Sequence, residues 1–259
     1  MKPCARLGVA LTLAAATVAG TACGGSPAGA TRSEEILVFA AASLTESFAA
    51  IGKSFEHHHP TVRVRFNFGP SDGLATGIGS GAPADVFASA SPKWMDAVAD
   101  SPGVDDRAVF ARNRLVVVVP SANPAHIRSL ADLAKPGIKL VLAAPAVPAG
   151  QYARHALAKA GLADAEHNVV SNEEDVKGVV QKVVLGEADA GIVYATDVTP
   201  AVRAKASSIP IPDELDVLAA YPIAVIHGTH HSPTARAFVE FVLGPGQSIL
   251  RHAGFLPPP

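Results

Sequence analysis

The chain has 259 residues, a length that fits one large domain or two smaller ones. Hydrophobic residues make up 49% of it and charged residues only 17%, so a disordered chain is excluded, because there is ample apolar surface to bury. The 21 basic and 23 acidic residues give a net charge of -2 without any long basic run, which argues against nucleic acid as a partner.

Residues 1–22 have the pattern of a secretory signal. Lys2 and Arg6 precede an apolar stretch that is short for a membrane span and contains no acidic residue. The small residues before Cys23 resemble a bacterial lipoprotein processing site, at which this cysteine becomes the lipidated first residue. The alternative is ordinary cleavage nearby, with Cys23 left as a free thiol. Cys4 would leave with the signal, so the mature chain could form no internal disulfide.

A short tether at 23–35, rich in small residues, precedes the folded part. The apolar run at 36–42 is typical of a buried strand, and apolar residues at helical spacing from Leu44 to Phe55 predict a helix that Pro60 ends. Up to the middle of the chain, the same patterns predict strands at 62–68, 86–89 and 115–119, a tight turn at 69–73, and helices at 74–78 and 92–98.

The second half of the chain continues this alternation of strands and helices. The expected strands are 139–143, 190–194, 216–219 and 223–227, and the expected helical segments are 129–133, 147–157, 176–183 and 237–242. Repeated strand–helix units predict an α/β fold with largely parallel sheets.

Four turns at the starts of predicted helices share one chemical property. A helix N-terminus has unpaired N–H groups and a partial positive charge, so it can hold an anion. These turns are 42–43, 70–71, 148–150 and 175–176. Ser43 and Ser71 would each add a hydroxyl group, so converging turns would form a cage of neutral donors around one oxyanion.

Each turn also has an ordinary interpretation. Ser43 and Glu46 match a capping box, in which the serine caps its own helix. Asp72, Glu174 and Asp175 suit helix N-termini but would repel an anion, unless their side chains point away from it.

Two further patterns suggest other chemistry. The segment 69–73 has the Gly-x-Ser-x-Gly form of a hydrolase nucleophile elbow centred on Ser71, and aspartates and histidines follow it in the order that a catalytic triad requires. Only one predicted strand precedes the strand that leads into this segment in the mature chain, and no His-Gly-Gly-type oxyanion segment occurs, which argues against a hydrolase. The histidines at 57–59 suit the end of a helix and those at 230–231 a polar loop, so we expect no metal bound there as a free cation.

Seven segments resemble, in order, the molybdate-binding proteins of ABC importers. They are 38–46, 81–87, 91–96, 147–152, 174–176, 191–194 and 221–225. The resemblance covers nearly all of 36–255 and implies a periplasmic-binding-protein type II fold, with two α/β lobes around a cleft joined by a two-segment hinge. Lobe 1 is expected at 36–119 and 220–259, and lobe 2 at 120–219.

The resemblance also implies the ligands of the oxyanion, which are hydroxyl groups and backbone amides. They fall on Ser43, Ser71, Ala149, Val176 and Tyr194. The chain departs from the family at its second turn, where Pro70 has no N–H group and Asp72 brings a charge. A cage made only of donors suits molybdate, a dianion without a proton, whereas hydrogenphosphate would need an acceptor.

A receptor of this kind is an extracytoplasmic binding protein and not an enzyme. The resemblance implies that it captures molybdate, and tungstate as well, as a monomer without a cofactor, and delivers the anion to the permease of an ABC importer. Lobe closure would complete the cage, and a lipid at Cys23 would anchor the protein to the outer face of the cell membrane. A receptor for sulfate or phosphate, and a serine hydrolase using Ser71, are the alternatives.

Overall fold

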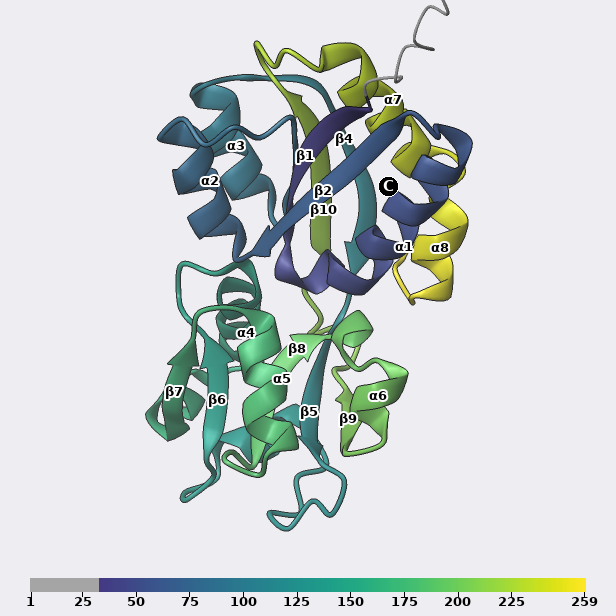
Figure 1. Cartoon of the computed structure of the whole chain (residues 1–259). Helices are drawn as coiled ribbons and strands as arrows, with labels where there is room; N and C mark the ends of the chain where they lie inside the picture. The colour runs from purple at the N-terminus through teal and green to yellow at the C-terminus, as the bar shows by residue number, and fades with distance from the viewer. Residues whose placement is uncertain (1–32) are drawn as a thin grey trace, which may run out of the picture. The chain divides into compact units, whose positions relative to one another are not determined.

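Two five-stranded sheets organise residues 33–259, the part of the chain that the computed structural model describes (Figure 1). The expected signal, Cys23 and most of the expected tether lie outside these residues. The first strand begins at Glu34, so the last two residues assigned to the tether belong to the fold. Within residues 33–259, no helix combines the length and apolarity needed to cross a membrane.

The first sheet has the strand order β2-β1-β3-β10-β4. Its strands are β1 (Glu34–Ala41), β2 (Val62–Gly69), β3 (Val86–Ala88), β4 (Val104–Asn113) and β10 (Ala219–Ile226). Helices α2 (Ser71–Gly79) and α3 (Pro92–Asp100) cover one face, and α1 (Thr45–His58), α7 (Ser232–Leu243) and α8 (Gln247–His252) cover the other (Figure 1). Neighbouring strand residues point to opposite faces, so Val38 and Phe39 belong to different hydrophobic clusters.

The second sheet has the strand order β7-β6-β8-β5-β9. Its strands are β5 (Leu115–Pro120), β6 (Leu140–Ala143), β7 (Val169–Glu173), β8 (Ala190–Tyr194) and β9 (Ala206–Pro210). Its helices are α4 (Pro148–Lys159), α5 (Val176–Val184) and α6 (Pro200–Arg203). Four 3-10 helices complete the described part of the chain: η1 (Ala42–Leu44), η2 (Leu130–Ala134), η3 (Ala163–Asn168) and η4 (Ala195–Asp197).

Both sheets are mixed, and the prediction of largely parallel sheets is wrong. β1 is parallel to β2 and β3, and β6 is parallel to β7 and β8. β10 and β5 run antiparallel to both of their neighbours. Each of these two strands follows directly after the chain has crossed from the other sheet. It therefore enters its sheet from the crossing end and runs opposite to the parallel strands.

Three strands were not expected from the sequence, and one expected pair is a single strand. β4 begins with charged residues, and β7 and β9 have few apolar residues, so their hydrophobic pattern is weak. β10 contains Pro222 between the expected strands 216–219 and 223–227. In the structure, this proline lies at a register shift against β4, where a missing N–H group is tolerated.

The sheet pairing also moves one expected lobe boundary. The apolar run at 115–119 was assigned to lobe 1, but as β5 it pairs with β8 and β9 in the second sheet. The chain therefore leaves the first sheet between Asn113 and Leu115 rather than near Val119, because the unexpected strand β4 occupies that place at the sheet edge. It returns at Ala219, beside the expected crossing at Ala220.

We predict that Gly150→Ala strongly destabilises the protein. A Cβ at this position in α4 would overlap the carbonyl oxygens of Ala143 and Ala144, which belong to the backbone and cannot rotate away. Overpacking of this kind costs about 3 kcal/mol or more of the free energy of unfolding, which urea titration measures. Gly77→Ala in α2 is the control, because its nearest new neighbour is 3.8 Å away. It should be neutral or stabilising by up to about 1 kcal/mol. Equal stability of both variants would contradict the prediction.

Candidate functional site

A small pocket lies at the carboxyl ends of the parallel strands of both sheets, a common place for ligands in α/β folds. The first sheet and its helices contribute Ala41, Ala42, Ser43, Gly69, Pro70, Ser71 and Ala90. The second contributes Val147, Pro148, Ala149, Asp175, Val176 and Tyr194. The empty volume is about 220 Å³, part of it open to solvent. The structure thus brings all five expected ligand residues to one place.

Three of the four helices that begin at this pocket lack a capping side chain. Their N-cap residues are Ala41, Pro70 and Val147, which have no side-chain acceptor. Helix N-caps are commonly Ser, Thr, Asp or Asn, whose oxygen atoms occupy first-turn N–H groups. Among residues 33–259, no hydrogen bond outside the regular elements uses the N–H groups of Ser43 or Ala149. These amides are therefore free donors beside the pocket.

The fourth helix, α5, is capped by Asp175. The carboxylate of this residue accepts a hydrogen bond from the N–H group of Gly178 at 2.9 Å, so it is engaged by its own helix. Val176, the first residue of α5, keeps its amide beside the pocket. Asp72 and Glu174 are not among the lining residues. Of the three acidic residues that seemed to oppose an anion site, only Asp175 therefore lines the pocket, and one of its carboxylate oxygens is held by its own helix.

The two serine hydroxyls are buried and already have one partner each. Ser71 Oγ accepts a hydrogen bond from the N–H group of Ala90 at 3.1 Å, which leaves the hydroxyl hydrogen free to donate. Ser43 Oγ lies 2.9 Å from the hydroxyl oxygen of Tyr221. Burial raises the pKa of Tyr221 well above its ordinary value, so its phenol remains protonated and can donate to Ser43. Ser43 can then donate to a ligand.

The capping-box interpretation of Ser43 and Glu46 is wrong. α1 has Leu44 as its N-cap and no side-chain cap. The Ser43 hydroxyl contacts Tyr221 instead, and the Glu46 carboxylate binds Lys177. Instead of capping a helix, both side chains contact residues that lie far away in the sequence. No local motif predicts such contacts.

Tyr194 has a buried hydroxyl group that no atom of residues 33–259 satisfies. The residue ends β8, lines the pocket and is 1% exposed. Burial raises the pKa of this phenol well above its ordinary value, so it is a donor at any physiological pH. A buried polar group without a partner is costly, and such a group in a pocket points to a ligand.

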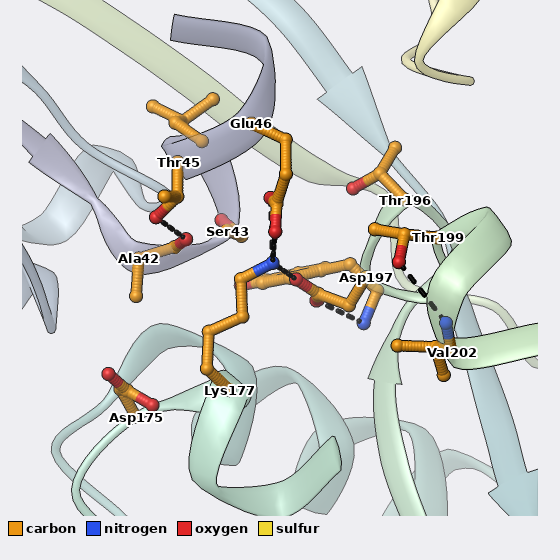
Figure 2. A network of polar contacts seen from close by, with 12 residues as sticks. Ala42, Ser43, Thr45, Glu46, Asp175, Lys177, Thr196, Asp197, Thr199 and Val202 are labelled. Carbon is orange, nitrogen blue, oxygen red and sulfur yellow. Dashed lines mark hydrogen bonds and ion pairs between the residues drawn. The ribbon is translucent and has the colours of Figure 1, made fainter. Parts of the chain in front are cut away.

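A network of charges adjoins the pocket (Figure 2). Lys177 Nζ lies 2.8 Å from Glu46 Oε2 and 3.4 Å from Asp197 Oδ1. Asp197 Oδ2 accepts a hydrogen bond from the backbone N–H group of Tyr194 at 3.2 Å. Burial raises the pKa of Asp197 to about 6, although the charge of Lys177 opposes this shift. Burial disfavours the charged form of Lys177, but Asp197 and Glu46 together raise its pKa, so it stays protonated.

This network and Tyr221 were not found from the sequence. Lys177 and Glu46 are separated by 131 positions, and no motif joins them. Tyr221 lies in one of the segments that carry the family resemblance, which was the only available signal for it.

The neighbourhood of Ser71 does not support a hydrolase. No histidine lines the pocket formed by the described residues, and the Ser71 hydroxyl contacts a backbone amide rather than a base. His227 and His231 interact with Asp105 and Asp85 in the first lobe. Among residues 33–259, no group of three or more His, Cys, Asp or Glu side chains could hold a metal ion.

Residues 36–256 match the family model described as bacterial extracellular solute-binding protein. The molybdate-binding protein ModA of Mycobacterium tuberculosis is 41% identical over 236 residues, which cover 90% of this chain and 89% of that protein.

Two solved structures share the fold. The periplasmic molybdate-binding protein of Azotobacter vinelandii is 22% identical with a TM-score of 0.76, and the match covers 86% of this chain and all of that one. The sulfate-binding protein SubI of Mycobacterium tuberculosis is 21% identical with a TM-score of 0.78, over 86% of this chain and 87% of that one.

These likenesses confirm the predicted periplasmic-binding-protein fold with two α/β lobes. The same comparisons support a binding protein that acts outside the cytoplasm, and not the serine hydrolase. The chain belongs to the family of bacterial extracellular solute-binding proteins.

Proposed function

We propose that the protein is the molybdate receptor of an ABC importer and that it also binds tungstate. The observation that carries this proposal is the buried, unpartnered hydroxyl of Tyr194 in a pocket surrounded by free first-turn amides. The similarity to a relative named as a molybdate-binding protein, at 41% identity, supports the choice of anion. In this proposal the anion is the cargo, and no cofactor takes part.

The proposed ligand set consists of Ser43, Ser71, Ala149, Val176 and Tyr194. Their three hydroxyls and four backbone amides are all neutral, and no lysine or arginine lines the pocket among the described residues. A hydrogen bond to a charged group contributes roughly 1.5–3 kcal/mol, so about seven such bonds can offset the desolvation of a dianion. Since every group donates, the pocket favours an anion that carries no proton.

This donor set distinguishes the alternative anions by two properties. Hydrogenphosphate carries a proton and needs an acceptor, and the one carboxylate among the described lining residues, that of Asp175, already has its Oδ1 atom directed to the N–H group of Gly178. Sulfate has no proton at neutral pH, and it is smaller than molybdate, so it would leave some donors too far away. The fold itself does not discriminate, since the sulfate-binding protein SubI shares it.

Titration calorimetry on ligand-stripped protein tests the choice of anion. We expect one molybdate or one tungstate to bind per chain. Sulfate should bind about 100-fold more weakly, because losing one or two charged hydrogen bonds costs about 2.7 kcal/mol. Phosphate should bind at least as weakly as sulfate. Absence of heat with molybdate would refute the proposal, and preferential binding of sulfate would replace it with the alternative.

We predict that Tyr194→Phe weakens molybdate binding by about 10- to 100-fold, because one hydrogen bond to a dianion is lost. The hydroxyl has no partner among residues 33–259, so its removal should leave the thermal midpoint of the ligand-free protein unchanged or slightly higher. Calorimetry measures the first effect and circular dichroism the second. Unchanged affinity would remove Tyr194 from the ligand set.

The proposal also places the protein outside the cytoplasm, held to the membrane by a lipid at Cys23. There the protein, as a monomer, delivers the bound anion to the permease. Support for the anchor comes from the small residues before Cys23 and the apolar stretch that precedes them. We expect Cys23→Ser to abolish incorporation of a fatty-acid label and to release the protein from the membrane fraction. Cys4→Ser is the matched control and should change neither. Membrane retention of unlabelled Cys23→Ser protein would contradict the anchor.

A further inference from the structure

Lys177 forms an ion pair between the two lobes. It lies in the first turn of α5, one residue after Val176, and its partner Glu46 lies in the first turn of α1, just after η1, which contains Ser43. Among the ion pairs of residues 33–259, apart from those at the chain crossings around Arg114, no other pair joins residues of different sheets. The pair therefore connects two helix starts that face the same pocket.

The same ammonium group also reaches the turn that holds Tyr194. Asp197 is fully buried, binds Lys177 through Oδ1 and accepts the Tyr194 N–H group through Oδ2. Figure 2 shows the Lys177 side chain extending from α5 with its nitrogen between the Glu46 and Asp197 carboxylates. Lys177 is not a lining residue of the pocket, so it contacts the supports of the ligand set rather than the ligand.

We propose that Lys177 is a positioning residue that fastens α1 to the Tyr194 turn across the cleft and thereby slows release of the bound oxyanion. This inference rests on the proposed function. An anion can leave only when the lobes separate, and separation breaks the contact between Lys177 and Glu46. The contact with Asp197 lies within one lobe and survives opening. The energy of the cross-lobe contact therefore adds to the barrier for release.

The rate of association should depend on this contact much less than the rate of release does. The open form has not yet made the contact between Lys177 and Glu46, so the lysine does not lower the barrier to entry. Most effects of substitutions at a closed interface fall on the rate of dissociation. A change in release at nearly constant association would therefore identify the cross-lobe role.

Trp94 provides a signal for closure. It is the only tryptophan of the chain, and its indole N–H group in α3 donates to the carbonyl of Ala146, just before α4 of the second lobe, at 3.0 Å. Separation of the lobes would break this hydrogen bond and leave the indole N–H group to water, so the emission of Trp94 should report opening.

The experiment compares Lys177→Met, which keeps the aliphatic stem, with Glu46→Gln and with the double variant. Molybdate release is followed by stopped-flow emission of Trp94 after mixing with an excess of ligand-stripped Trp94→Phe protein, which captures the released anion without emitting, and affinity is measured by calorimetry. Both single variants should release molybdate about tenfold faster, with association within about twofold of wild type. The double variant should be no faster than Lys177→Met, because both substitutions remove the same contact. Lys177→Arg should restore most of the slow release.

Lys182→Met is the matched control. It removes another lysine of α5, whose ion pair with Glu187 stays within the second lobe, and it should release molybdate at the wild-type rate. Glu46 is 58% exposed, so Glu46→Gln folds even where Lys177→Met does not. Wild-type release rates in both Lys177→Met and Glu46→Gln would overturn the inference. Additive effects in the double variant would also overturn it.

Failure of the proposed function can be distinguished from failure of the inference about Lys177. If wild-type protein binds no molybdate, that proposal fails by itself, and the same release experiment with whichever of tungstate, sulfate or phosphate binds still tests the role of Lys177. Faster release of that anion from both Lys177→Met and Glu46→Gln would support the cross-lobe contact, and wild-type release rates in both would refute it.

Discussion

The cost of removing a charged anion from water governs the design of this site. No cation lines the pocket within the described residues, so the compensation must come from dipoles that point to one small volume. Backbone amides supply such dipoles only at helix starts, where they have no partner in their own helix. Four helix starts must therefore meet at one point, and this requirement explains why both sheets place the carboxyl ends of their parallel strands beside the pocket.

The division into two lobes follows from the same requirement. Ser43 and Ser71 belong to the first sheet and its helices, and Ala149, Val176 and Tyr194 to the second, so neither lobe contains the complete donor set that we propose. The strands β5 and β10, which follow the crossings, are antiparallel to their neighbours and leave the parallel strands to form the ligand face. In the proposed receptor a divided site would make binding and closure one event, to which the pair of Lys177 and Glu46 would also contribute.

The sequence predicts the parts of this molecule that have a strong local pattern. Helices such as α1 and α5 were expected from apolar periodicity, and the four turns from their position before helices. The strand β4 was not expected, because its charged residues obscure the apolar alternation of an edge strand, and β10 was expected as two strands that lie on either side of Pro222. The contacts of Ser43 with Tyr221 and of Lys177 with Glu46 join distant positions, so only the folded chain brings them together.

The apolar N-cap residues Ala41, Pro70 and Val147 have a consequence for the folded protein itself. Each leaves the start of its helix without the side-chain oxygen that commonly completes it. A bound oxyanion would supply that missing acceptor for three helices and two lobes at once, and so serve as a shared cap. The solute then becomes a structural part of the protein, and the stability of the fold itself records whether the receptor is loaded.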